Sequence, residues 1–399
     1  MQIDLTDPEL FRANAFWPAL AWLRAHDPVH WHADSAGSGF WVLTKYADIV
    51  TAYANTDVFS SKYGMRLGSD PDAVAAVAGR MLIVSDPPGH SYLKRVLTRA
   101  FSPGAMARIE GLVRDVVVGV LADALARGEL EFVEVAKLIP NHVVCALLGV
   151  PRQDWSWLGA LTTDAFESGD AGRRGAHAEI FLYFADLLAE RRASPGEDLV
   201  SQIATDRDRG SGVDGTPALT DEEIIFNCNG ILAGANETTR YSAAGGLLEF
   251  ACRPDQWRLL RGGGEAAVRG GVEEVLRWTT PGVHALRTAL MPEVIRGVPI
   301  AAGQRVTLWN SSANRDEAVF DRPGEFDIRR TPNRHVTFGH GRHLCLGARL
   351  ARLELGIFLT ELAARTDRIE VTADPLYNSS NFTWGLCELP VRLTPASRR

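Results

Sequence analysis

The chain has 399 residues, of which 46% are hydrophobic and 23% charged, a composition that excludes disorder along its whole length. Its 42 lysines and arginines and 49 aspartates and glutamates leave a formal net charge of −7, which is unlike the basic footprint of a nucleic-acid binder. The five cysteines are odd in number and widely spaced, which argues against a disulfide framework and for a reducing compartment.

No segment of the sequence predicts a signal peptide or a membrane span. The N-terminal residues MQIDLTDPELFRAN have no basic region followed by an apolar one, so they do not resemble a secretory signal. The longest apolar runs, such as residues 143–150, fall far short of the roughly 18–20 residues that cross a bilayer. We therefore expect a cytoplasmic protein that binds neither membrane nor nucleic acid.

The first half of the chain combines a short strand, a long loop and amphipathic helices. Residues 38–44 have the composition of a strand, and residues 62–90, rich in Gly, Asp, Ser and Pro, are typical of a long loop. Residues 106–127 and 176–192 carry apolar side chains at close to the helical period, which predicts two helices. Residues 204–219 then indicate an exposed connector.

The clearest helix of the sequence begins at Thr220. Thr220 and Glu223 have the spacing of a capping box, and Leu219 and Ile224 have that of a hydrophobic staple. The pattern continues without proline to Pro254, over roughly thirty residues or about 45 Å of helix. A helix of this length usually crosses a whole domain.

Strand patterns return in the last third of the chain. Residues 293–300 and 303–309 are predicted strands, and we expect them to pair as a hairpin around Pro299–Gly303. Neither this region nor the loops before it separate two self-sufficient cores. The sequence therefore predicts one large and mainly α-helical domain.

The segment that carries the strongest chemical signal is FGHGRHLCLG, residues 338–347. Gly339, Gly341 and Gly347 allow a tight backbone and the close approach of a ligand. A helical pattern follows, so the thiol of Cys345 lies near a helix N-terminus, where free N–H groups favour a thiolate.

Three interpretations of Cys345 remain open on the residues alone. A buried and inert cysteine is the default for a lone thiol, but it leaves the glycines unexplained. A zinc site could use His340, His343 and Cys345, but it needs a fourth ligand that the sequence does not offer clearly. A thiolate bound to haem iron needs only one cysteine, with glycines that let the flat macrocycle approach.

This segment resembles the haem-binding signature F-x-x-G-x-x-x-C-x-G of the cytochrome P450 family, with Phe338, Gly341, Cys345 and Gly347 in the four fixed places. The resemblance covers nearly the whole chain and fits the soluble bacterial branch. It implies the mainly α cytochrome P450 fold, in which a long central helix lies over the haem and a small β-rich subdomain accompanies a large helical domain.

The same resemblance predicts a single domain over residues 1–399. Its β-rich portion is expected mainly at about residues 28–60 and 285–330. Its helical portion is expected mainly at about residues 86–280 and 345–365.

Residues 234–240, GANETTR, resemble the family's [A/G]-G-x-[D/E]-T element of the long helix. Gly234 and Ala235 are small enough to leave space for a flat group against the helix, at a cost of about 1 kcal/mol per interior glycine. The resemblance implies that Thr238 and Glu237 deliver protons beside the haem.

The sequence Glu274-Val275-Leu276-Arg277 resembles the family's E-x-x-R element. Glu274 and Arg277 share one helix face. In the family this is a buried structural pair that supports the cysteine loop. Its usual third partner, an arginine further along the chain, is not evident, and Glu325 lies near the expected place.

The resemblance also implies the residues that bind haem b, with Cys345 as the iron ligand. The propionate partners and the remaining cofactor-binding residues are His90, Lys94, Arg287, His343, Gly339, Phe338 and Gly347.

The activity implied is that of a monooxygenase that activates O2 with electrons from NAD(P)H. A ferredoxin and its reductase would deliver these electrons at a face near Arg342, His343 and Arg349, and the enzyme is expected to be a monomer. The alternatives are a peroxide-driven peroxygenase and a haem sensor without enzymatic activity.

The expected substrate is a small organic molecule, and a secondary-metabolite intermediate is the class we favour. The residues nominated for its pocket are Met81, Ile83, Asn229, Ala233, Val283, His284 and Trp384.

Overall fold

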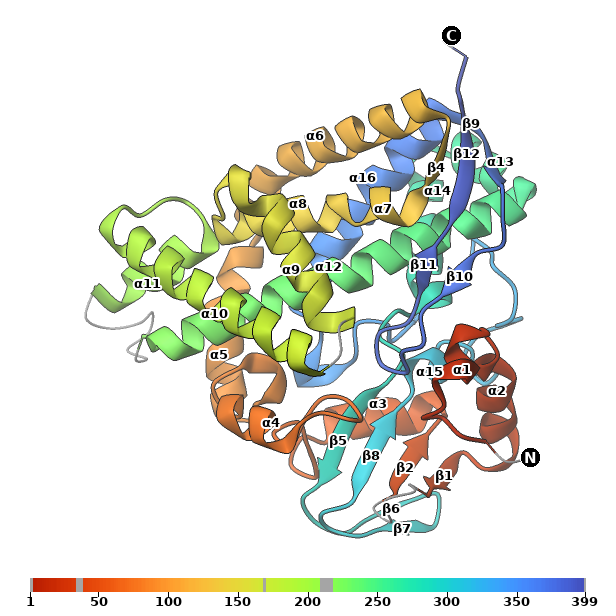
Figure 1. Cartoon of the computed structure of the whole chain (residues 1–399). Coiled ribbons are helices and arrows are strands. Elements are labelled where there is room, and N and C mark those ends of the chain that lie inside the picture. The colour runs from red at the N-terminus through yellow and green to blue at the C-terminus, as the bar shows by residue number, and fades with distance from the viewer. Residues whose placement is uncertain (1–2, 34–38, 168–169, 209–217, 398–399) are drawn as a thin grey trace.

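We describe the fold from a computed structural model, which describes residues 3–33, 39–167, 170–208 and 218–397. Helices form the larger part of the molecule, and a sheet with the N-terminal helices packs at one end of them (Figure 1). The architecture is therefore mainly α with small sheets, as the sequence predicts. Within the described ranges, no helix combines the length and the apolar character that a membrane crossing requires.

The helices lie in every quarter of the chain. Their bounds are Pro8–Arg12 (α1), Phe16–His26 (α2), Tyr46–Ala54 (α3), Pro71–Val77 (α4), Gly89–Leu97 (α5), Pro103–Arg127 (α6), Phe132–Ala136 (α7), Leu138–Leu148 (α8), Trp155–Glu167 (α9), Asp170–Ala193 (α10), Leu199–Asp208 (α11), Asp221–Cys252 (α12), Pro254–Gly262 (α13), Gly264–Thr279 (α14), Asn310–Ala313 (α15) and Ala348–Arg365 (α16).

The strands are short and form four small sheets with the orders β1-β2-β8-β5-β3, β4-β12-β9, β10-β11 and β6-β7. Several of them lie outside the two ranges expected to be rich in strands. Their bounds are Val29–His32 (β1), Phe40–Leu43 (β2), Phe59–Ser60 (β3), Glu129–Glu131 (β4), Ala285–Ala289 (β5), Glu293–Ile295 (β6), Val298–Ile300 (β7), Arg305–Leu308 (β8), Thr366–Val371 (β9), Leu376–Tyr377 (β10), Leu386–Glu388 (β11) and Pro390–Pro395 (β12).

The predicted hairpin around Pro299–Gly303 is wrong. Residues 293–300 form a hairpin of their own, because Arg296 and Gly297 both adopt positive φ angles, of 51° and 80°, and close a two-residue turn between β6 and β7. The next strand, β8, pairs instead with β5 in antiparallel and with β2 in parallel orientation.

The long loop predicted at residues 62–90 contains regular structure. The side chain of Asp70 accepts hydrogen bonds from backbone N–H groups at the start of α4, and Pro71 occupies its first position. A 3-10 turn over Leu82–Val84 follows, and α5 begins at Gly89. The predicted connector at residues 204–219 is described only in part, because residues 209–217 lie outside the described ranges.

The long helix begins as its sequence predicts. The Thr220 hydroxyl accepts from the N–H of Glu223 at 3.2 Å, and the Glu223 carboxylate accepts from the N–H of Thr220 at 2.8 Å. Leu219 and Ile224, the staple pair, are both buried. The helix α12 then runs for 32 residues and packs against α8, α10 and α14. It is the axis about which the other helices are arranged (Figure 1).

Gly270 marks a close approach between α14 and the chain that crosses it. A Cβ atom placed at Gly270 would lie 2.0 Å from the carbonyl oxygen of Ile328. We therefore expect Gly270→Ala to lower the free energy of unfolding by about 2–3 kcal/mol, because backbone must move to admit the methyl group.

The matched control is Gly111→Ala in α6, where the new Cβ would meet nothing within 4 Å. This change is expected to raise stability by about 0.5–1 kcal/mol, through helix propensity. Urea unfolding of the two variants measures the difference, and equal stabilities would contradict the close packing of α14 against residue 328.

Candidate active site

The cysteine loop is a tight turn held against α3. Gly339 and Gly341 have φ angles of 71° and 65°, a region that favours glycine. A Cβ atom at Gly341 would lie 3.2 Å from the carbonyl oxygen of Tyr53, so α3 leaves no room for a larger residue. The N–H of Cys345 donates to the carbonyl oxygen of Phe338 at 2.9 Å and closes the loop.

The residues after the cysteine place a helix N-terminus directly beyond the sulfur. Helix α16 begins at Ala348, with Gly347 as its N-cap. Burial raises the pKa of the Cys345 thiol, while hydrogen bonds from the N–H groups of Gly347 and Ala348 and the charge of Lys94 act to lower it. Cys345 nevertheless is an exposed residue. It is therefore a thiol that an incoming group can reach and whose anion the backbone stabilises.

A group of positively charged and imidazole side chains gathers beside the cysteine loop. His90 and Lys94 come from α5, Arg287 from β5 and His343 from the loop itself. The rings of His90 and His343 lie 4.1 Å apart, and the Arg287 guanidinium lies 5.3 Å from the ring centre of Tyr53. Lys94 donates to two carbonyl oxygens of the loop, including that of Leu344 at 3.0 Å.

The electrostatics of this group favour the binding of an anion. The pKa of His343 is lowered to about 2, first by burial and then by the charges of Arg287, His90 and Lys94. The pKa of His90 is lowered to about 4, first by burial and then by Lys94. Neither Arg287 nor Lys94 forms an ion pair with a carboxylate in the described part of the chain.

These residues fit the cofactor that the motif implies. A haem carries two propionate carboxylates, and the uncompensated cations near Cys345 provide partners for them. His90 Nδ1 is buried without a hydrogen-bond partner among the described residues. A thiolate donor and a nearby cationic group are thus both available to a haem.

The middle of α12 has a face of small residues. The Thr238 hydroxyl donates to the carbonyl oxygen of Gly234 at 2.8 Å, within the same helix. A Cβ atom at Gly234 would meet nothing within 4 Å, so open space lies beside the helix at this point. Thr238 Oγ1 keeps lone pairs that can accept a hydrogen bond from a polar group in that space.

Glu237 belongs to a buried network that the sequence analysis missed. Arg240 Nη2 donates to the Glu237 carboxylate at 2.6 Å and to the Tyr241 hydroxyl at 2.9 Å. Asn378 Nδ2, from the C-terminal region, donates to the same hydroxyl at 2.9 Å. The i,i+3 spacing of Glu237 and Arg240 was a usable signal in the sequence.

Glu274 and Arg277 form a fully buried ion pair with two hydrogen bonds, of 2.7 and 2.8 Å, and neither side chain is exposed. The third partner is Arg330, whose Nε lies 3.1 Å from the Glu274 carboxylate. Glu325, the residue near the expected place of this partner, contributes its backbone carbonyl oxygen to Arg277 and Arg330. Arg330 lies just beyond residues 320–326, the segment in which the sequence led us to expect this partner.

The residues nominated for a substrate pocket are spread over several places. The side chain of Met81 packs against α12 at Gly230. A Cβ atom added to Gly230 would lie 2.6 Å from the Cε atom of Met81. Ala233 lies next to the open face of α12 and is half-buried. The Asn229 amide oxygen is 3.4 Å from His177 Nδ1 on α10. Ile83 is exposed.

The other three nominated residues lie toward the N-terminal helices and the C-terminal turn. Val283 and Trp384 belong to a buried aromatic cluster with Trp309, and the Trp384 indole donates to the carbonyl oxygen of Phe11 at 3.0 Å. His284 Nδ1 lies 2.7 Å from the carbonyl oxygen of Asn381, and burial lowers the His284 pKa to about 4.

The zinc interpretation of the loop finds no support in the described residues. Within the ranges that the structure describes, no three His, Cys, Asp or Glu side chains are grouped so that they could hold a metal ion. His340, His343 and Cys345 are therefore not assembled as a ligand set.

Comparisons with known proteins find relatives along nearly the whole chain. A family model described as "Cytochrome P450" matches residues 268–365. The chain is 36% identical to Cytochrome P450 NovI of Streptomyces niveus, over 98% of this chain and 97% of NovI, and 33% identical to linalool 8-monooxygenase of Pseudomonas putida, over 98% and 99%. The crystal structure of P450 OxyD, described as involved in the biosynthesis of vancomycin-type antibiotics, superposes with a TM-score of 0.89 at 36% identity and covers 99% of this chain and 100% of OxyD.

The network at Glu274 generates a stability prediction. Glu274→Ala is expected to lower the free energy of unfolding by about 3–5 kcal/mol, because it leaves Arg277 and Arg330 buried without their carboxylate. Little folded protein should then retain the cysteine loop in place. Glu265→Ala, at an exposed ion pair on the same helix, is the control and should change stability by less than about 1 kcal/mol. Thermal unfolding distinguishes the two, and a stable Glu274→Ala protein would show that the network is dispensable.

Proposed function

The chain belongs to the cytochrome P450 family and is a monooxygenase of that class, and we propose that Cys345 is the residue through which it holds haem iron. Enzymes of this family use O2, electrons from a reductase and a small-molecule substrate. We further propose that the cofactor is haem b and that its electrons come from NAD(P)H.

One observation supports the proposal above the others: the sulfur of Cys345 is reachable and is followed by two N–H groups that hydrogen-bond to it. Such hydrogen bonds stabilise a thiolate and moderate its charge. Phe338, Gly339 and Gly347 shape the loop that carries it. When bound, haem supplies the activation of dioxygen, which a thiolate ligand favours.

The remaining residues orient the cofactor and handle protons. Arg287, His90, Lys94 and His343 bind the propionates and neutralise their charge. Thr238 Oγ1, already fixed by its bond to Gly234, accepts and passes on a hydrogen bond beside α12.

Glu237 holds the proton supply next to Thr238, and Arg240 and Tyr241 fix the position of its carboxylate. We assign Arg240 the role of positioning Glu237, because its Nη2 donates to both the Glu237 carboxylate and the Tyr241 hydroxyl.

The substrate we propose is an intermediate of secondary metabolism, since OxyD is described as acting in the biosynthesis of antibiotics and has similar length and fold. Met81 and Ala233 are the nominated residues that lie along the middle of α12, and we propose them as pocket walls.

A ferredoxin would dock near the exposed Arg342 and Arg349. We further propose a cytoplasmic monomer.

Replacing the sulfur tests the proposal directly. Cys345→Ser is expected to abolish the red-shifted carbon monoxide band of the reduced protein, because an alcohol does not replace a thiolate as iron ligand. Cys252→Ser, at an exposed cysteine of α12, is the control and should keep the band. Survival of the band in Cys345→Ser would refute the assignment of the ligand.

The role of Thr238 has its own test. Thr238→Ala should retain haem and the carbon monoxide band, yet divert at least tenfold more of the NAD(P)H electrons into hydrogen peroxide, because proton delivery fails. The control is Thr360→Ala, which should leave peroxide formation unchanged. It removes the same kind of hydrogen bond, 2.7 Å long and made to the carbonyl oxygen four residues earlier, from an exposed site on α16. Peroxide formed per NAD(P)H is the measurement. Unchanged peroxide in Thr238→Ala would remove this residue from proton delivery.

A further inference from the structure

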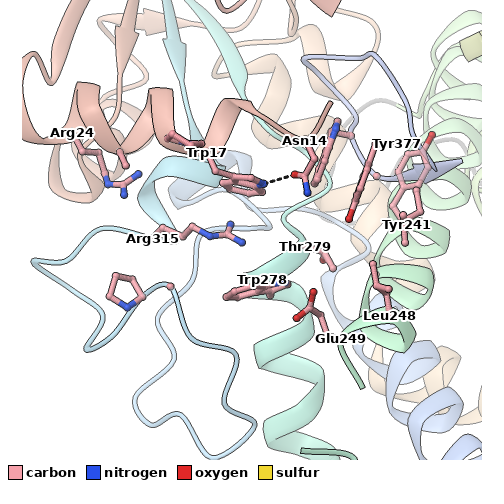
Figure 2. Close-up of a pocket in the computed structure, with 18 of the residues that line it drawn as sticks. Asn14, Trp17, Arg24, Tyr241, Leu248, Glu249, Trp278, Thr279, Arg315 and Tyr377 are labelled. Atoms are coloured by element: carbon pink, nitrogen blue, oxygen red, sulfur yellow. Dashed lines mark hydrogen bonds between the residues drawn. The ribbon is translucent and has the colours of Figure 1, made fainter. Parts of the chain in front are cut away.

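A cavity lies between α2, the C-terminal half of α12, the end of α14 and residues 377–386 (Figure 2). Its volume is about 500 Å³, which is in the range of small-molecule sites. None of the residues proposed to bind haem or deliver protons lines it. The aromatic side chains on its walls are Trp17, Tyr241, Trp278, Tyr377 and Trp384.

The side chain that distinguishes this cavity is Arg315. Its guanidinium carbon lies 3.5 Å from the ring centre of Trp17 and 4.5 Å from that of Trp278. Figure 2 shows the guanidinium between these two indoles and directed toward the cavity. Both faces of the group are thus covered, and its N–H edge is left for a partner. Nη1 has no hydrogen-bond partner among the described residues.

The neighbouring carboxylates do not neutralise Arg315. No ion pair of Arg315 occurs in the described ranges, although acidic side chains lie around it. Each of these acids is paired with a different arginine: Glu317 with Arg24, Glu249 with Arg253, and Glu274 with Arg277 and Arg330. Arg315 therefore has no carboxylate partner of its own in the described chain, a costly arrangement for a guanidinium shielded from water.

We propose that this cavity is a binding site for a small aromatic monocarboxylate. A carboxylate can accept two parallel hydrogen bonds from the edge of a guanidinium, which is the part of Arg315 that the indoles leave free. The aromatic walls offer stacking and edge contacts to a flat body. The carboxylate of Glu249, which also lines the cavity, disfavours an anion of higher charge such as phosphate. The inference does not depend on the residue roles proposed for the haem site.

The test compares a charged probe with its neutral counterpart. Isothermal titration calorimetry of the purified full-length holoprotein should show saturable one-to-one binding of trans-cinnamate. Cinnamamide, which has the same shape without the charge, should bind at least tenfold more weakly. The haem absorption spectrum, recorded in parallel, should stay unchanged, because the probe binds away from Cys345.

Variants locate the binding. Arg315→Gln should weaken cinnamate binding by roughly tenfold to a hundredfold, the range expected for charge-assisted hydrogen bonds. Arg322→Gln is the matched control, since Arg322 is an exposed arginine nearby in the chain that does not line the cavity. Ala21→Leu narrows the cavity without changing the charge of Arg315 and should also weaken cinnamate binding at least tenfold. This variant provides an independent test if Arg315→Gln fails to fold.

Four results would overturn the proposal. The first is the absence of saturable cinnamate binding at millimolar concentration. The second is equal affinity for cinnamate and cinnamamide. The third is cinnamate binding that neither Arg315→Gln nor Ala21→Leu weakens. The fourth is binding that shifts the haem spectrum, because it would place the probe at the haem.

Discussion

The burial of one negative charge, that of Glu274, determines how the chain leads into the cysteine loop. A carboxylate without exposure to water is tolerated only when every oxygen is paired. Here the partners are Arg277 on the same helix, Arg330 and Asn333 further along the chain, and the N–H of Asp327. All of these partners except Arg277 lie in residues 327–333, so that segment must fold onto α14 to satisfy the charge.

Arg277 extends the same constraint to the chain on either side. It donates to the carbonyl oxygens of Asn314, Pro323 and Glu325. Asn314 in turn bonds to Val336 and Thr337, the residues that lead into the cysteine loop. The position of the Cys345 sulfur is therefore fixed by this polar network and by the contact of the loop with α3. Neither of these supports involves the cofactor.

Two arginines of this protein are kept inside without a carboxylate partner in the described chain, and both lie against aromatic rings. Arg287 lies over Tyr53 and Arg315 lies between two indoles. Aromatic faces offset part of the cost of burying a guanidinium but do not neutralise it. At Arg287 the two propionates of a haem provide the missing charge in our proposal, and the same reasoning applied to Arg315 leads to a separate anionic ligand.

Features encoded within a few residues of each other could be predicted from the sequence. Such local features are the capping box at Thr220, the length of α12 and the glycine loop before Cys345. The overall fold was predicted from the family resemblance. The pairing of β8 and the partner of Glu274 could not be predicted in this way. Arg330 lies 56 residues from Glu274, and several other arginines lie near it in the sequence. Only the folded structure identifies which of these arginines pairs with Glu274. Similarly, the turn at Arg296 depends on a non-glycine residue with positive φ, which the sequence does not favour.

The N-terminal segment is tied into the interior on several sides. The N–H of Leu5 donates to His32 Nε2, Asn381 donates to the carbonyl oxygen of Leu5, and Trp384 donates to that of Phe11. The C-terminal end, by contrast, lies at the opposite end of the molecule from the N-terminal helices (Figure 1), where the N–H of Ala396 donates to the carbonyl oxygen of Arg365 at 2.7 Å. A genetically fused electron donor, or a tether to an electrode, therefore belongs at the carboxyl end of this enzyme, because an attachment at the amino end would pull on the loops that close the aromatic cluster.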